Sequence, residues 1–197
     1  MKKIILTITY ILILLVLNGC WILSVYPFYC KDNIVKLPEI YGEWKILKDS
    51  FGDMKEKNSN AWNFGNDYIK TFDNENIQAT IAVVYFSIDQ KYFIDCISDE
   101  HDGLNKYWKV MIFPAHTILK VELKGDSLRL IPLDFDKTIE IMENNRTELE
   151  YLKPLKKEDI GLFINSSESW IEFLSQNMHD PALFNIKNEL LFKRSHN

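Results

Sequence analysis

Cysteine, glycine, proline and positive charge are all scarce in this chain of 197 residues. Three cysteines are too few for a disulfide-stapled scaffold, and no two of them form a CxxC pair. Seven glycines and six prolines exclude a collagen-like or low-complexity chain. The formal charge of -5 argues against nucleic acid as a partner, since that would require a clustered basic face. The remaining composition, 47% hydrophobic and 13% aromatic, is typical of one folded domain.

The amino terminus has the features of a secretory signal. Lys2 and Lys3 precede a largely apolar run from Ile4 to Leu17, about 14 positions long, whereas a bilayer-spanning helix needs roughly 20. The run ends in Leu17-Asn18-Gly19-Cys20, which resembles the lipobox of bacterial lipoproteins. That resemblance implies transfer of diacylglycerol to the Cys20 thiol, cleavage before Cys20 and acylation of the new amino terminus.

An uncleaved membrane anchor is the alternative, because apolar residues after Cys20 extend the run to about 23 residues. In either case we expect an envelope location, with the protein body facing away from the cytoplasm, at the inner or the outer membrane. Without Lys2 and Lys3 the chain keeps 21 basic and 28 acidic residues, a net charge of -7, which disfavours electrostatic docking onto anionic lipid. The expected organisation is a signal peptide (1–19), a lipidated tether (20–38) and a single domain (39–197).

Short strands dominate the rest of the chain. Alternating or apolar runs predict strands at 42–47, 79–86, 92–97 and 107–113. The clearest hairpin is 118–131, where Gly125-Asp126 places glycine first in a two-residue turn, as a type II′ turn prefers.

Two helices and a last strand complete the pattern. Asp134 or Asp136 is expected to cap one helix, and Asn165 or Ser166 the other. The last strand is expected at 189–194. Many short antiparallel strands with two peripheral helices predict a mainly β protein, an antiparallel barrel, with a two-sheet sandwich as the alternative.

The first predicted strand begins with Gly42-Glu43-Trp44. This resembles the G-x-W signature of lipocalins and related calycins. In those barrels a late Arg or Lys packs across the tryptophan and closes the narrow end, a role that the resemblance gives to Arg194.

Four stretches of the chain resemble a group of uncharacterised bacterial lipoproteins. Together they make up about a third of the chain. The stretches are SVYPFY, LPEIYGEW, FPAHTILKVELKGDSLRLIPLDFD and SSESWIEFLSQNMHDPALF. The resemblance implies an envelope lipoprotein and carries no activity.

Few residues are candidates for chemistry. His116 lies at a bend between predicted strands without a recognisable catalytic motif, so a structural histidine is the favoured interpretation. Helix capping explains the Asp134/Asp136 pair, and a solvated turn explains the acidic residues 99–102. Cys30 and Cys96 are expected to be free, with a disulfide between them as the alternative. We expect no metal, no cofactor and no enzymatic activity.

The abundant aromatic residues suggest a binding function. Trp62, Tyr85 and Tyr92 are the candidate residues for lining a barrel that holds an apolar or amphiphilic small molecule. Alternatively, these aromatics simply fill the barrel. A structural platform for another envelope protein is the second hypothesis, with Trp170 or the loop 48–60 as contact points.

Overall fold

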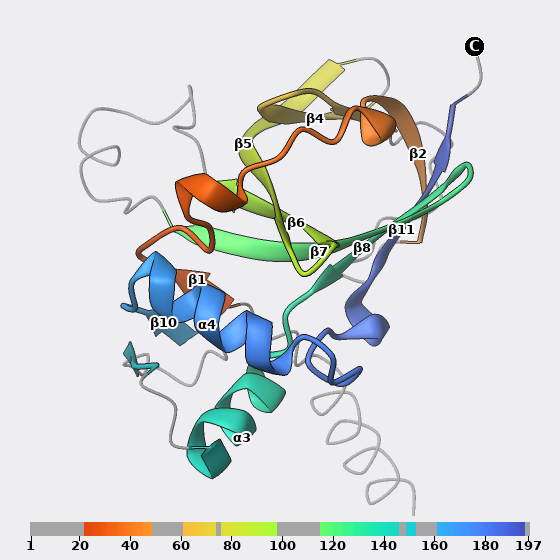
Figure 1. Ribbon diagram of the computed structural model, residues 1–197. Coiled ribbons are helices and arrows are strands. Elements are labelled where there is room, and N and C mark those ends of the chain that lie inside the picture. Colours follow the sequence, from red (N-terminus) through yellow and green to blue (C-terminus); the bar gives the residue numbers. More distant parts are fainter. Residues whose placement is uncertain are drawn as a thin grey trace, which may run out of the picture.

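The described residues form a closed, eight-stranded antiparallel β-barrel with the helices α3 (Phe135–Asn145) and α4 (Ser167–Asn177) outside it (Figure 1). This computed structural model describes residues 22–48, 61–73, 76–97, 115–145, 149–152 and 161–195. The predicted mainly β barrel is therefore confirmed over the sandwich. Four features of the sequence lie outside the described residues: the lipobox, the acidic residues 99–102, the predicted strand 107–113 and all of the loop 48–60 except Lys48.

Seven barrel strands follow one another around the barrel, and the last strand of the chain closes it between the first and the seventh. Every pairing between barrel neighbours is antiparallel. The barrel strands are β2 (Gly42–Lys48), β3 (Ala61–Phe64), β4 (Tyr68–Asp73), β5 (Asn76–Ile88), β6 (Lys91–Ile97), β7 (His116–Lys124), β8 (Ser127–Pro132) and β11 (Leu190–Arg194). Closure pairs both edges of every barrel strand, which removes the open edges of a flat sheet.

Two tight turns show how the sequence specifies the hairpins. Gly125 has φ +57°, whereas Asp126 has no positive φ, as expected for the predicted type II′ turn between β7 and β8. Between β5 and β6, Asp89 and Gln90 have φ 45° and 63°. Two positive φ values indicate a type I′ turn, in which glycine is the preferred second residue.

A small sheet extends from the start of β7. Strand β1 (Ile22–Ser24) pairs with β7 at His116 and runs parallel to β10 (Gly161–Phe163). Strand β10 in turn pairs antiparallel with β9 (Tyr151–Leu152).

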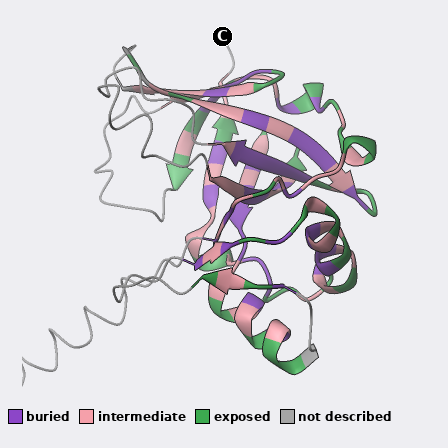
Figure 2. Ribbon diagram, turned by 90° about the vertical axis from the view of Figure 1, so that its left-hand side faces the viewer, coloured by how far each residue is buried: buried purple, intermediate pink, exposed green. Residues whose placement is uncertain are grey.

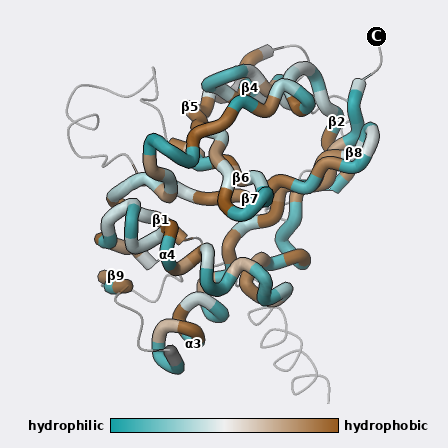
Figure 3. The backbone as a smooth tube through the Cα atoms, viewed as in Figure 1, coloured by the Kyte–Doolittle hydropathy of each residue, from teal (hydrophilic) through white to brown (hydrophobic). Residues whose placement is uncertain are grey.

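The barrel wall from β5 to β8 is buried on both faces. Alternate side chains of a strand point to opposite faces, so a strand buried on both faces carries hydrophobic residues at consecutive positions. These residues are brown in Figure 3. One set points into the barrel and forms the interior cluster with residues of β2, β3, β4 and β11. The other set points outward and forms the outer cluster with the amino-terminal segment and the helices. Figure 2 shows the buried positions along the barrel strands.

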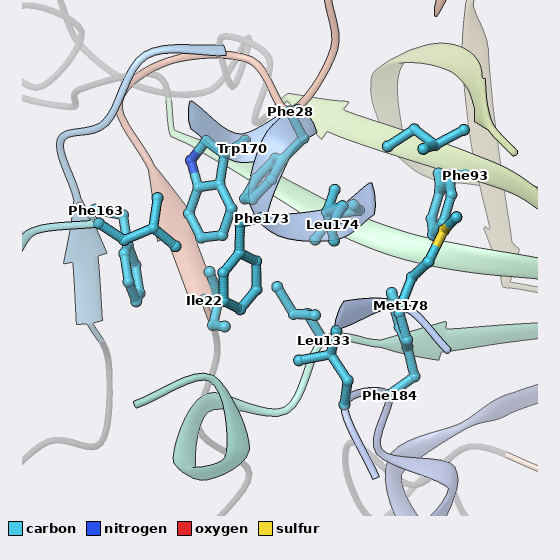
Figure 4. Close-up of a cluster of buried hydrophobic side chains, with 14 of the residues drawn as sticks. Ile22, Phe28, Phe93, Leu133, Phe163, Trp170, Phe173, Leu174, Met178 and Phe184 are labelled. Atoms are coloured by element: carbon cyan, nitrogen blue, oxygen red, sulfur yellow. The ribbon is translucent and has the colours of Figure 1, made fainter. Parts of the chain in front are cut away.

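The outer cluster is centred on Trp170 (Figure 4). Its ring centroid lies 4.5 Å from that of Phe28 and 5.1 Å from that of Phe163. Trp170 belongs to α4 (Ser167–Asn177), whose first turn is capped by the Ser166 hydroxyl, which accepts a hydrogen bond from Ser169 N–H at 3.3 Å. The cluster therefore joins the helix, the small sheet and the barrel wall into one body.

The other helix, α3 (Phe135–Asn145), begins after β8. The Asp134 carboxylate accepts a hydrogen bond from Lys137 N–H at 2.8 Å and a second from the Asn185 side chain at 2.7 Å. Asp134 therefore caps the helix, whereas Asp136 is exposed in its first turn.

The amino-terminal segment belongs to the folded domain from residue 22 onward, which differs from the tether expected at 20–38. Ile22 and Phe28 are buried in the outer cluster, and Leu37 in the interior cluster. Two short 3-10 helices, η1 (Lys31–Asn33) and η2 (Pro38–Ile40), carry the chain along the barrel. The segment looks like a linker because its apolar residues, although frequent, follow neither a helix nor a strand period over its length.

Replacing Gln90 with glycine is expected to raise the free energy of unfolding by about 0.5–1 kcal/mol, because glycine adopts a positive φ without steric cost. Urea denaturation measures the change. Gly125→Ala is the matched variant in the other hairpin, and it should lower the free energy of unfolding by about 1 kcal/mol. A destabilised Gln90→Gly protein would contradict the assigned turn.

Candidate functional site

One end of the barrel is closed by an arginine stacked on a tryptophan. The Arg194 guanidinium lies 4.3 Å from the centre of the Trp44 ring. It also donates hydrogen bonds to the backbone carbonyls of Tyr41, at 3.2 Å, and Glu39. Trp44 is fully buried, and its indole N–H donates to the Ile40 carbonyl at 2.7 Å.

These contacts bring together the residues singled out by the G-x-W pattern. Gly42 opens β2 with φ +108°, a conformation that favours glycine, and Trp44 follows in the same strand. Arg194, at the end of β11, pairs directly with Trp44 across the two strands. The 3-10 helix η2 thereby covers this end, which we call the closed end.

The barrel interior next to the closed end is filled by the protein's own side chains. Tyr85 is 2% exposed and donates its hydroxyl hydrogen to the Gly65 carbonyl at 2.8 Å. Burial raises the pKa of this hydroxyl far above its ordinary value of 10. Tyr85 is therefore a neutral part of the core.

Some interior side chains are only partly buried. Ile46, Trp62 and Ile81 pack against the interior cluster but keep part of their surface exposed. Trp62 pairs directly with Trp44 across β3 and β2, and its ring lies 5.1 Å from the Phe192 ring, which is fully buried. We call Ile46, Trp62 and Ile81 the half-buried interior residues.

Tyr92 does not share this location. It follows the β5–β6 turn, at the rim of the closed end, and is 42% exposed. The structure thus places Tyr85 in the packed interior, Trp62 at its half-buried part and Tyr92 on the rim.

A buried carboxylate lies on the outer side of the barrel wall. Asp95, in β6, is fully buried and accepts two hydrogen bonds. His116 Nδ1 lies 2.7 Å from one carboxylate oxygen, and Phe28 N–H donates to the other at 2.8 Å. The carboxylate therefore joins β6, β7 and the amino-terminal segment.

Burial raises the pKa of the Asp95 carboxyl, because a charge in a low-dielectric environment is costly. The hydrogen bonds from His116 and Phe28 partly offset this effect by stabilising the ionised form. Burial and the charge of Asp95 also raise the pKa of Tyr29.

The Asp95–His116 pair has the orienting carboxylate that a catalytic histidine needs, and within the described ranges no side-chain nucleophile hydrogen bonds to His116. The nearby Ser24 hydroxyl is buried and accepts hydrogen bonds from Trp170 Nε1, at 3.0 Å, and Tyr26 N–H, at 3.3 Å. The pair links β6 to β7, and we call it the clasp.

Sequence reasoning did not single out Asp95. The available signal is a lone acidic residue between buried apolar neighbours in the run Tyr92–Ile97. A charge at such a position needs partners. The sequence does not show that these partners are His116 and a backbone N–H of residue 28, because the three positions meet only in the folded chain.

Cys30 and Cys96 are both free thiols. Cys96 belongs to the interior cluster, where burial raises the pKa of its thiol, and Cys30 is partly exposed near Glu168. Trp170, expected as a contact point for a partner, is fully buried and cannot touch one. In the described ranges, no group of three or more His, Cys, Asp or Glu side chains is placed to hold a metal ion.

No family model, curated protein or solved structure matches the chain. None of the helices in the described part of the chain is long and apolar enough to cross a membrane.

A double-mutant cycle with Asp95→Ala and His116→Ala is expected to give a coupling energy of about 1–3 kcal/mol, since each single variant leaves a polar partner unpaired. Urea denaturation measures it. The Lys120–Glu122 pair, 2.7 Å apart at the surface, is the matched control, and its coupling should stay below about 0.5 kcal/mol. Equal couplings for the two pairs would contradict the clasp.

Stability should also depend on pH through Asp95. Its raised pKa means that the folded state binds a proton more tightly than the unfolded state, where the pKa is about 3.9. The stability that this proton contributes is present below pH 3.9. It is lost as the pH rises to the pKa that Asp95 has in the folded state. The free energy of unfolding of the native protein, minus that of Asp95→Asn, should therefore fall over this range. A rise over the same range would show that the pKa is lowered instead.

Proposed function

We propose that this chain is a membrane-anchored envelope lipoprotein whose barrel binds the apolar part of an amphiphilic small molecule. The observation that carries the proposal is incomplete burial inside an apolar barrel. Ile46, Trp62 and Ile81 pack against the interior cluster but are only partly buried, whereas the residues of the cluster itself are buried. An apolar ligand would complete the burial of these three side chains.

The chemistry of the interior supports an apolar ligand. None of the buried polar or charged side chains among the described residues belongs to the interior cluster. A charged headgroup inside would lack partners and would be costly to bury. An acyl chain or a similar apolar group would instead add to the hydrophobic area buried against Ile46, Trp62 and Ile81. The polar part of the ligand would then stay in water.

The proposed anchoring rests on the lipobox-like sequence ending at Cys20. Two or more acyl chains on one cysteine would hold the protein on a membrane stably, as one chain does not. A barrel held at a membrane surface could take up an amphiphile from the lipid beside it. We therefore infer a binding or carrier function, without a chemical step.

Binding is best tested on a chain that starts at Trp21, because it keeps every described residue, including β1. We expect the fluorescent apolar probe N-phenyl-1-naphthylamine to bind and a lysophospholipid to displace it. Trp62→Ala should weaken binding about tenfold, since burial of a large aromatic side chain contributes roughly 1.5 kcal/mol or more. The readout is a fluorescence titration.

Tyr92→Ala is the matched control, because it removes an aromatic ring from the closed end and should leave the affinity unchanged. An equal loss of affinity in the two variants would show that the ligand does not bind against Trp62. No binding by the unsubstituted chain, together with a bare mass in native mass spectrometry after incubation with envelope lipids, would contradict the binding function.

A platform for another envelope protein is the second candidate, favoured by one surface feature. Tyr92 and Leu123 are 42% and 38% exposed and lie on neighbouring strands, two residues apart in register. An exposed aromatic beside an exposed leucine is suited to a protein contact. In cross-linked cells, Tyr92→Ala would then abolish capture of a partner, whereas Trp62→Ala would not.

A further inference from the structure

The three-stranded extension has one buried and one exposed face. On the buried face, Ile22, Ser24 and Phe163 are almost completely buried in the outer cluster or beside Trp170. Because side chains alternate along a strand, the residues between them point to the other face.

The exposed face carries a row of leucines. Leu23 pairs with Leu162 in β10, and Leu162 pairs with Leu152 in β9. Directly paired residues share a face of the sheet, so the three side chains lie side by side across the strands. Leu152 is 54% exposed, and Leu23 and Leu162 are partly exposed. Ile164, two residues after Leu162, continues the row and is 39% exposed. We call these four residues the leucine row.

The leucine row starts three residues after Cys20, and β1 starts two residues after it. An extended chain spans at most about 3.6 Å per residue, so the Cα atoms of Cys20 and Ile22 are no more than about 7 Å apart. A lipid on Cys20 would therefore hold β1 at the membrane surface.

We propose that the leucine row is a membrane-contact face that holds the barrel against the lipid surface in one orientation. The inference rests on the membrane anchoring proposed above and adds how the folded domain meets the bilayer. Tyr26 is 50% exposed just after β1, and tyrosine is a residue enriched at the membrane–water interface. Four exposed or partly exposed aliphatic side chains beside an anchor can enter the headgroup region at a favourable free energy.

The lipid expected at this face is zwitterionic rather than anionic. The chain has an excess of acidic residues, and the exposed Glu150 directly precedes β9. Neither feature attracts an anionic headgroup. Contact is therefore expected from apolar burial, with little dependence on salt.

The test uses the full chain, purified from the envelope and reconstituted into phosphatidylcholine vesicles. An environment-sensitive fluorophore is attached at Leu152→Cys, and at Leu123→Cys as the matched exposed leucine on the barrel rim. Cys30→Ser prevents labelling at the partly exposed thiol, and Cys96 is protected by burial. We expect doxyl-labelled lipids to quench the label at position 152 at least twofold more than the label at position 123. Ile164→Cys is a second position in the row with the same expected result.

Equal quenching at positions 152 and 123, with the protein still floating with the vesicles, would overturn the contact face and leave the anchoring intact. A protein that does not float with the vesicles would overturn both the anchoring and the contact face. Stronger quenching in vesicles containing anionic lipid would overturn the expected headgroup preference.

Discussion

The contact between Arg194 and Trp44 is the interaction on which the rest of the barrel depends. It joins the last strand of the chain to the first barrel strand, and it holds the 3-10 helix before that strand over the barrel end. Because a cation–π contact on a buried tryptophan with two further hydrogen bonds is specific in geometry, it also fixes the register between β11 and β2.

A second constraint is that the wall from β5 to β8 separates two apolar cores. The interior cluster stabilises the barrel, and the outer cluster attaches helix α4 and the amino-terminal segment to it. Asp95 is a buried carboxylic acid on the outer side, and its hydrogen bond from Phe28 N–H positions the amino-terminal segment. The segment that leads to the proposed anchor is thereby attached rigidly to the barrel.

The sequence predicts the local features well, because each depends on neighbours in the chain. The Gly125 hairpin follows from its turn residues, and each helix cap is one of the two residues that the sequence offers, Asp134 and Ser166. The alternation along the strands predicts an antiparallel barrel, but not the number of its strands. The clasp of Asp95 and His116 is not predictable in this way, since its partners come from distant segments. Trp170 lies on the same helix face as the buried Phe173 and Leu174, so its burial follows from the helical spacing, whereas its contact with Phe28 comes from a distant segment.

Nuclear magnetic resonance of the chain starting at Trp21, with a bound lysophospholipid, tests the central claim most directly. We expect intermolecular nuclear Overhauser effects between the acyl chain and the half-buried interior residues, namely the Trp62 indole or the Ile46 and Ile81 methyl groups. Effects confined to the rim around Tyr92 and Leu123, or none at saturating ligand, would contradict a barrel that binds amphiphiles against these residues.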